Sequence, residues 1–211
     1  MPISILMSIV VVVIFGHLGT PASGTMEPAH PYATEFEQAR SETDNPLQLE
    51  ILADDVVTAE EYEATTSAFL NCMHEAGYEV VPESDLLMPA LYQFSWQFPD
   101  ATPGSEIPQS TFHAYDQQFD DCYFEWAIQV HMMYSSVIYF PGNEDVFDAN
   151  LACLLADGHV PDDFDLADLE HAAMTGDWGI GVNPGTMEFT LCLVNPFKIG
   201  MDAPASPSAT P

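Results

Sequence analysis

Residues 58–77 read TAEEYEATTSAFLNCMHEAG and carry the signals of one helix with both ends marked. Thr58 and Glu61 have the spacing of a capping box, in which each side chain bonds the other residue's backbone amide. The following apolar positions recur every three or four residues, which predicts one buried helix face: Tyr62, Thr66, Phe69, Met73 and Ala76. The final glycine suits a left-handed helix end. The pattern predicts a helix over 59–76 that carries Cys72 near its end.

The end of this helix has a parallel further along the chain. Residues 72–82 read CMHEAGYEVVP and residues 153–161 read CLLADGHVP. Each segment has Cys-x4-Gly, then a ring-bearing residue, valine and proline, and each is followed by another cysteine in a helical pattern, Cys122 or Cys192. This similarity predicts an internal repeat, and chance resemblance over so few positions is the alternative.

Four cysteines allow three disulfide pairings. We predict Cys72–Cys122 and Cys153–Cys192, because a duplication keeps each bond within its half and sequential helices tend to pack as neighbours. Loop entropy does not decide between the pairings, since it grows only logarithmically with length. Free buried thiols are the alternative. A structural zinc site is disfavoured because no Cys-x2-Cys pair occurs.

Outside these segments, the pattern predicts one strand and several helices. Residues 92–98 alternate aromatic and polar side chains, which indicates a strand with a buried aromatic face. Helices are predicted at 34–43, at 47–53, as one long helix over 110–139, at 144–157 capped by Asn143, at 166–174 capped by Asp165 or Asp163, and from Asn183-Pro184 to Val194. The fold class is therefore mostly α with a short β element, as a single disulfide-stapled helical domain that the repeat could divide into two halves.

The N-terminal segment is typical of export. Residues 3–18, ISILMSIVVVVIFGHL, are apolar and uncharged but short for a spanning helix. Ala22 and Gly24 then occupy the small-residue positions of a signal-peptidase site. An uncleaved membrane anchor is the alternative. No Lys or Arg precedes the apolar run, so either the terminal amine suffices or the chain starts upstream of Met1.

These signals together predict a secreted or cell-envelope-associated protein with disulfide bonds, since such bonds persist in oxidising compartments. We expect five parts: a signal peptide (1–24), a leader with short helices (25–57), a first helical half (58–140), a second helical half (141–201) and a disordered tail (202–211).

The charge balance excludes whole classes of partner. The chain has 33 Asp and Glu against two basic residues, Arg40 and Lys198, for a formal net charge of −31. Nucleic acid and anionic membrane surfaces are excluded because both would be repelled. With 47% hydrophobic residues and 13 Phe, the chain is nevertheless able to build a core.

Two groups of residues are candidates for metal binding. The densest acidic run contains the calcium candidates Asp162, Asp163, Asp165 and Asp168, although it lacks the spacing and central glycine of an EF-hand loop. A helix start with favourably placed acids is the alternative. Neighbouring His and Met side chains are candidates for copper binding: His131, Met132, Met133, Met73 and His74. Adjacent residues of a helix point in different directions and cannot easily share one ion, so filling of the core is the favoured interpretation.

No motif for nucleophilic catalysis occurs, and a carboxylate pair has no specificity among 33 acids. We therefore expect a non-catalytic exported protein, without a cofactor, whose acidic surface binds a basic protein or cations. A secreted hydrolase that uses a carboxylate pair is the alternative. Oligomeric state is not predicted.

The arrangement of an acidic exported chain, a helix ending in Cys-(Met/Leu)-x3-Gly, an aromatic strand and a Cys-bearing helix resembles secreted proteins of actinobacterial type. The resemblance covers Thr58 to Pro196 and implies a helical architecture but no activity. The chain departs from that pattern in lacking a lipid-anchor cysteine and in its scarcity of Lys and Arg.

Overall fold

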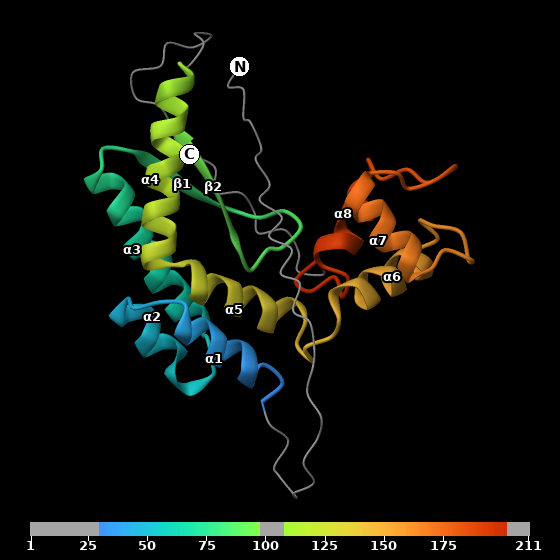
Figure 1. Cartoon of the computed structure of the whole chain (residues 1–211), viewed down its shortest axis with the longest axis horizontal. Helices are drawn as coiled ribbons and strands as arrows, with labels where there is room; N and C mark the ends of the chain where they lie inside the picture. Colours follow the sequence, from blue (N-terminus) through green and yellow to red (C-terminus); the bar gives the residue numbers. More distant parts are fainter. Residues whose placement is uncertain (1–29, 98–107, 202–211) are drawn as a thin grey trace, which may run out of the picture.

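The computed structural model describes residues 30–97 and 108–201, which are mostly helical with one small antiparallel sheet (Figure 1). The elements are α1 (Ala33–Ser41), α2 (Pro46–Ile51), a 3-10 turn (Leu52–Asp54), α3 (Ala59–Glu75), β1 (Glu79–Ser84), β2 (Tyr92–Gln97), α4 (Gln109–Trp126), α5 (Ile128–Tyr139), α6 (Val146–Ala156), α7 (Leu166–Thr175) and α8 (Met187–Val194). The mostly α fold class with a short β element and two disulfides is confirmed.

The predicted signal peptide and tail lie outside the described residues. Within the described ranges, no helix combines the length and the apolar character that a membrane span requires.

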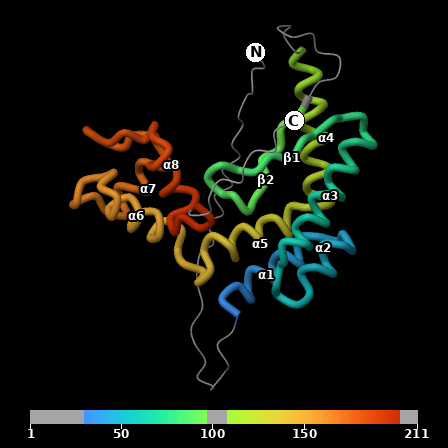
Figure 2. The backbone as a smooth tube through the Cα atoms, turned by 180° about the vertical axis from the view of Figure 1, so that it is seen from behind, coloured from blue at the N-terminus to red at the C-terminus, as the bar shows by residue number. Residues whose placement is uncertain are grey.

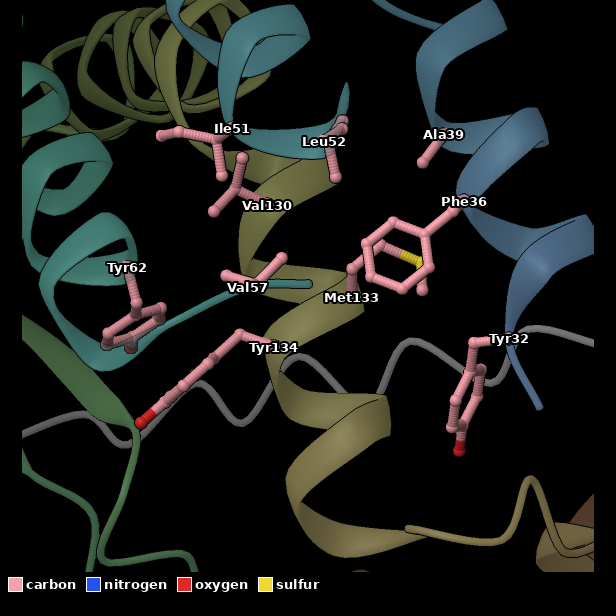
Figure 3. Close-up of a cluster of buried hydrophobic side chains, with 10 residues drawn as sticks. All are labelled: Tyr32, Phe36, Ala39, Ile51, Leu52, Val57, Tyr62, Val130, Met133 and Tyr134. Carbon is pink, nitrogen blue, oxygen red and sulfur yellow. The ribbon is translucent and has the colours of Figure 1, made fainter. Parts of the chain in front are cut away.

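Three hydrophobic clusters hold these elements together. The first joins α1, α2, the start of α3 and α5, and Figure 3 shows its buried residues: Tyr32, Phe36, Ala39, Ile51, Leu52, Val57, Tyr62, Val130, Met133 and Tyr134. The second joins the end of α3, the two strands and α4 around Phe69, Met73, Tyr115, Cys122 and Ala127. The short helices predicted as part of a leader therefore belong to the core of this half.

The third cluster belongs to α6, α7 and α8 alone, with buried residues Cys153, Leu154, Val160, Leu169, Phe189 and Cys192. These helices form a lobe beside the rest of the molecule, as both views show (Figures 1 and 2). We call residues 146–194 the C-terminal lobe and residues 30–139 the N-terminal lobe.

Helix α3 has the ends that the sequence predicts. The Thr58 hydroxyl accepts a hydrogen bond from the Glu61 amide at 3.2 Å, and the Glu61 carboxylate accepts one from the Thr58 amide at 2.8 Å. Gly77 has a positive φ of 90°, which ends the helix. The predicted buried face is present at Tyr62, Thr66, Phe69 and Met73, whereas Ala76, predicted on the same face, is exposed at the helix end.

The single helix predicted over 110–139 is wrong, because the chain breaks at the buried Ala127 into α4 and α5. The break is stabilised by Gln48, a buried residue of α2. Its side-chain amide donates to the carbonyl of Glu125 at 2.9 Å, and its oxygen accepts from the amide of Gln129 at 3.0 Å. A distant side chain thus satisfies backbone groups that a continuous helix would pair internally, and α5 turns away to pack against α1.

The predicted strand is confirmed over Tyr92–Gln97 as β2, although its aromatic side chains are half-buried rather than buried; residue 98 lies outside the described residues. Its partner β1 is absent from the sequence prediction. The two strands pair antiparallel, with Val80 opposite Trp96 and Pro82 opposite Phe94. Proline lacks the amide donor that a central strand needs, so Pro82 argues against a strand by sequence. A two-stranded sheet has only edge strands, which tolerate it.

The predicted start of α6 is displaced. Asn143 was expected as the cap, but Asp145 caps the helix by accepting from the amides of Phe147 and Asp148 at 2.9 and 3.2 Å. Asn143 instead has a positive φ of 55°, and its side-chain amide donates to the carbonyl of Pro31 at 2.7 Å. Asparagine tolerates this conformation, so it serves the turn before the helix.

Helix α8 also begins later than predicted. Pro184 was expected in the first turn, whereas the helix starts at Met187 and is capped by the Thr186 hydroxyl. The Asn183 side chain accepts from the Gly185 amide at 3.2 Å and so forms a turn of its own. Asparagine before proline marks turns as well as helix starts, and here the turn prevails.

The chain returns from α8 to the N-terminal lobe through Asn195. This residue is fully buried, and its side-chain amide donates to the carbonyls of Leu87 at 2.9 Å and Ile199 at 3.0 Å. Its oxygen accepts from the Ile199 amide at 2.8 Å. Leu87 lies in the connection between β1 and β2. Two residues after Asn195, the Phe197 ring packs edge-on against Phe140, which follows α5. Asn195 therefore links α8 to the N-terminal lobe: its backbone amide donates to the carbonyl of Leu191 at 2.8 Å, and its side chain bonds Leu87.

We predict that N195A lowers the free energy of unfolding by about 1–3 kcal/mol, because the substitution leaves partly buried backbone groups of Leu87 and Ile199 unpaired. Urea denaturation followed by circular dichroism measures the change. N183A is the matched control, since its side chain makes one hydrogen bond in an exposed turn. Equal losses in the two variants would show that Asn195 does not join the lobes energetically.

Candidate functional site

Both disulfides connect the last turn of one helix to a later helix. Cys72–Cys122 joins α3 to α4 with Cα atoms 5.8 Å apart, and Cys153–Cys192 joins α6 to α8 with Cα atoms 5.4 Å apart. The pairing predicted from the sequence is confirmed, and the described residues include no free cysteine.

The two Cys-x4-Gly segments end their helices with the same hydrogen bonds. The Gly77 amide bonds the carbonyl three residues earlier at 2.9 Å, and the Tyr78 amide bonds the carbonyl five residues earlier at 2.9 Å. Gly158 and His159 make the equivalent bonds at 3.1 and 2.9 Å. Both ends are Schellman motifs. Beyond the glycine the two segments diverge, since β1 follows the first and α7 follows the second.

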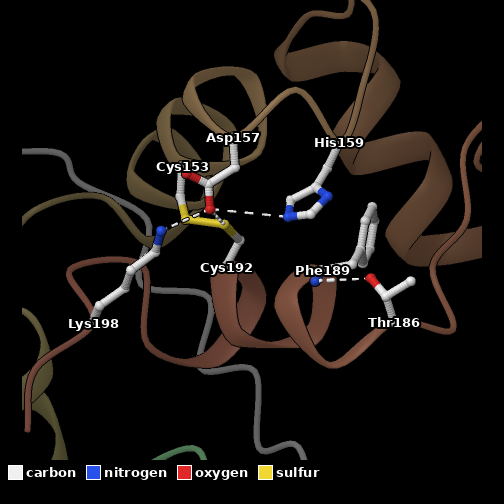
Figure 4. Close-up of a disulfide and its surroundings, with 7 residues drawn as sticks. All are labelled: Cys153, Asp157, His159, Thr186, Phe189, Cys192 and Lys198. Carbon is white, nitrogen blue, oxygen red and sulfur yellow. Dashed lines mark hydrogen bonds and ion pairs between the residues drawn. A yellow bond between two sulfur atoms is a disulfide. The ribbon is translucent and has the colours of Figure 1, made fainter. Parts of the chain in front are cut away.

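Charged and polar groups surround the second disulfide (Figure 4). The Asp157 carboxylate lies 2.7 Å from the Lys198 ammonium, 3.9 Å from Nε2 of His159 and 3.6 Å from Sγ of Cys192. Among the described residues, only Cys153, Asp157 and Cys192 form a group of three metal-capable side chains with converging ligand atoms.

Both basic residues of the chain are used inside the fold. Arg40 donates to the Asp55 carboxylate and to the carbonyl of Leu52, which secures the turn after α2. Lys198 pairs with Asp157 and secures the segment after α8. With a formal net charge of −31, the remaining carboxylates have no other Lys or Arg to pair with.

A cleft of about 280 Å³ lies beside α7 and combines carboxylates with aromatic rings. We call it the α7 cleft. Its lining includes Asp163 and Phe164 before the helix, Asp168 in the first turn, and Asp177 and Trp178 after it. His171 and the fully exposed Ile180 also line it. The Trp178 ring is held edge-on against the buried Phe189, with centroids 4.8 Å apart.

The predicted calcium candidates are divided between two roles. Asp165 and Asp168 form a capping box at the start of α7, with each carboxylate accepting from the other's amide at 3.0 and 3.1 Å. Asp163 and Asp168 line the α7 cleft, whereas Asp162 does not. The four do not form a group with converging ligand atoms. Asp165 and Asp168 therefore lie at a helix start, which is the alternative role predicted from the sequence.

A second acidic cleft, of about 350 Å³, lies between the segment after α1 and the end of α4. We call it the α4 cleft. It is lined by Glu42, Thr43, Asp44, Asp121, Phe124 and Glu125. Phe124 is 59% exposed, which is unusual for a phenylalanine ring. The two clefts therefore share one chemistry, in which carboxylates surround an accessible ring.

His131 is a structural residue. It is buried among aromatic rings, with Nε2 3.1 Å from the Thr66 hydroxyl and Nδ1 3.2 Å from the Tyr123 hydroxyl. Burial lowers the pKa of His131 to about 3, so the ring stays neutral. Met73 and Met133 are buried in different hydrophobic clusters, which fits core filling rather than copper binding.

Asp177 and Trp178 contribute to the α7 cleft but were not among the residues singled out in the sequence. Their segment has no periodicity, and only the fold brings it against α7. Comparison with known proteins adds no assignment: no family model, curated protein or solved structure matches this chain.

We predict that His131 makes the fold sensitive to acid. Its pKa is about 3 in the folded protein against 6.5 when unfolded, so the unfolded chain binds the extra proton as pH falls below 6.5. As pH decreases, the unfolding free energy of the wild type should therefore decrease relative to that of H131Q. The slope should approach 1.4 kcal/mol per pH unit, which corresponds to uptake of one proton on unfolding.

Urea denaturation from pH 7 to pH 4 measures this difference. H113Q, which removes an exposed histidine from α4, is the control. A pH-independent difference for H131Q would contradict the buried neutral imidazole.

We also predict that Tm rises between low salt and about 1 M NaCl, where the screening length falls to about 3 Å. The reason is repulsion among carboxylates that lack basic partners. Calorimetry measures the change, and the rise should shrink near pH 4, where carboxylates become protonated. A flat or falling Tm at pH 7 would mean that the acids are compensated locally.

Proposed function

We propose that this chain is an exported, non-catalytic protein that binds a basic protein or peptide through its acidic clefts. The observation that carries the proposal is the α7 cleft, where Asp163, Asp168 and Asp177 share a lining with Trp178. Nothing basic lines this cleft except His171. It therefore offers negative charge and an aromatic face together.

Such a lining suits an arginine or lysine side chain. Carboxylates bind a guanidinium or ammonium group through charge-assisted hydrogen bonds. A tryptophan face attracts the same cations by cation–π interaction. The volume of about 280 Å³ is at the small end for ligand pockets, which favours an inserted side chain over a large cofactor.

A basic partner fits this geometry better than a bound metal ion. Calcium needs several oxygens at about 2.3–2.6 Å from one point. Among the described residues, no group of three or more carboxylates converges in that way. A guanidinium or ammonium group can bind carboxylates that are more widely spaced. The exposed Ile180 also lines the cleft and adds apolar surface for the partner.

The net charge of −31 supports the same function at longer range. A uniform negative field raises the rate at which a basic partner arrives and lowers the rate for acidic ones. Arg40 and Lys198 each pair with a carboxylate of the same chain, so the charge of the other acidic residues is not compensated by Lys or Arg. Two disulfides and the apolar N-terminal run support an oxidising location outside the cytoplasm.

We predict that D163N weakens binding of an arginine-rich peptide about tenfold, the effect of losing about 1.4 kcal/mol of charge-assisted bonding. D162N is the matched control, because it removes the same charge from the adjacent residue outside the cleft lining. Fluorescence anisotropy of a labelled peptide at physiological salt measures both affinities.

Equal weakening by the two substitutions would show that only the general field matters and that the α7 cleft is not the site. Absence of binding by the wild type would overturn the proposed function. W178A should weaken binding further by removing the aromatic face, while a peptide with acids in place of arginines should not bind.

A further inference from the structure

The geometry points to a second, separate site: when the Cys153–Cys192 disulfide is reduced, the two thiolates, Asp157 and His159 bind one Zn²⁺ ion. Three of these ligand atoms, from Cys153, Asp157 and Cys192, already lie within 4.8 Å of one another. The fourth, Nε2 of His159, lies 3.9 Å from the same Asp157 oxygen (Figure 4). Two thiolates, an imidazole and a carboxylate are all zinc ligands.

The distances match a tetrahedral site. Zinc bonds sulfur at about 2.3 Å and nitrogen or oxygen at about 2.0–2.2 Å, so tetrahedral angles place neighbouring ligand atoms about 3.3–3.8 Å apart. The Asp157 oxygen is 3.6 Å from Sγ of Cys192 and 3.9 Å from Nε2 of His159. Cleavage of the disulfide lets the two sulfur atoms separate, and the His159 ring, which lies outside the group of three converging atoms, must move toward them to complete the tetrahedron.

His159 supplies an independent observation. Its Nε2 atom is buried and has no hydrogen-bond partner among the described residues. A buried unpaired nitrogen is costly, and a metal ion would use its lone pair. The nitrogen faces Asp157 rather than solvent, as Figure 4 shows.

Lys198 balances the charge in both states. In the oxidised protein its ammonium pairs with Asp157 at 2.7 Å. In the metal-bound state, two thiolates and one carboxylate outweigh the zinc ion by a single negative charge, which Lys198 still balances. Its side chain is 45% exposed and lies at the rim, so it has room to move aside.

The redox step needs a reductant, for which a dithiol is sufficient. The dithiol gives two electrons and two protons to the disulfide, becomes a disulfide itself, and leaves Cys153 and Cys192 as thiols. Zinc then displaces the two thiol protons into solvent as the two Zn–S bonds form. No other co-reactant is required.

The other half of the chain contains a natural negative control. The Cys72 segment has the same helix end and the same pair of backbone hydrogen bonds. At the positions equivalent to Asp157 and His159 it has Ala76 and Tyr78, neither of which binds zinc. Reduction of Cys72–Cys122 should therefore create no site.

Zinc stoichiometry in single-disulfide variants of the full chain tests the proposal. C72S/C122S keeps only the proposed site and C153S/C192S keeps only the other disulfide. After reduction with a phosphine, which does not compete as a thiol ligand, the first should bind one Zn²⁺ and the second none. Before reduction, neither should bind. Co²⁺ in place of zinc should give the thiolate charge-transfer and tetrahedral absorption bands.

In the C72S/C122S background, D157A/H159Y introduces the residues that the other half has at the same backbone positions. This substitution should weaken zinc binding by at least about a hundredfold, judged against the effects of ligand-supporting residues. Zinc should also raise the Tm of reduced C72S/C122S but not that of reduced D157A/H159Y.

Three results would overturn the proposal: no zinc binding by reduced C72S/C122S, equal binding after D157A/H159Y, or equal binding by the oxidised protein. Loss of structure on reduction without recovery on adding zinc would overturn it as well. Peptide binding at the α7 cleft is measured separately in oxidised protein, so failure of either proposal is distinguishable from failure of the other.

Discussion

Repulsion among the carboxylates is the constraint on which this structure depends. The chain carries 33 acidic residues and only two basic ones, so repulsion among the carboxylates destabilises the compact folded state.

The C-terminal lobe has few buried residues for its size, and domains this small need a cross-link to supplement the core. Each disulfide closes a loop of 39–50 residues, which in the chain-entropy model stabilises the fold by about 4 kcal/mol.

The few compensating charges are placed where the backbone changes direction. Arg40 holds the turn after α2 through Asp55, and Lys198 holds the segment after α8 through Asp157. Neutral amides do similar work elsewhere, since Gln48 supports the break between α4 and α5 and Asn195 joins the lobes. A buried neutral amide avoids the large free-energy cost of burying a charge without a partner. Such groups therefore suit a chain with only two basic residues.

Local signals in the sequence predict the parts of the fold whose causes are local. The capping box of α3, the capping box of α7 and the two Cys-x4-Gly helix ends each depend on residues within one turn. The break at Ala127 depends on Gln48, nearly 80 residues away in the chain, and no local pattern around 127 contains it. Strand β1 is hard to predict because it contains Pro82, which an edge strand tolerates and a central strand does not.

The same division applies to the site. The acids at 163 and 168 stand out as part of a dense run, and the disulfide pairing follows from the similarity of the two helix ends. Trp178 and Asp177 are added by a loop whose position depends on packing against Phe189. His159 and Asp157 become candidate metal ligands only because the fold brings Cys192 of α8 next to the end of α6.

Phe189 connects the two proposed sites physically. Its ring is almost completely buried and packs edge-on against Trp178 on one side, with centroids 4.8 Å apart, and against His159 on the other, 5.9 Å apart. In a close-packed interior a ring in contact with two neighbours cannot accommodate the movement of one without affecting the other. Phe189 is therefore a shared packing neighbour of Trp178 in the α7 cleft and of the proposed zinc ligand His159. The C-terminal lobe thus combines a disulfide, the candidate binding cleft and the candidate metal ligands around a single buried ring. The N-terminal lobe instead has Ala76 and Tyr78 at the equivalent positions of its own helix end.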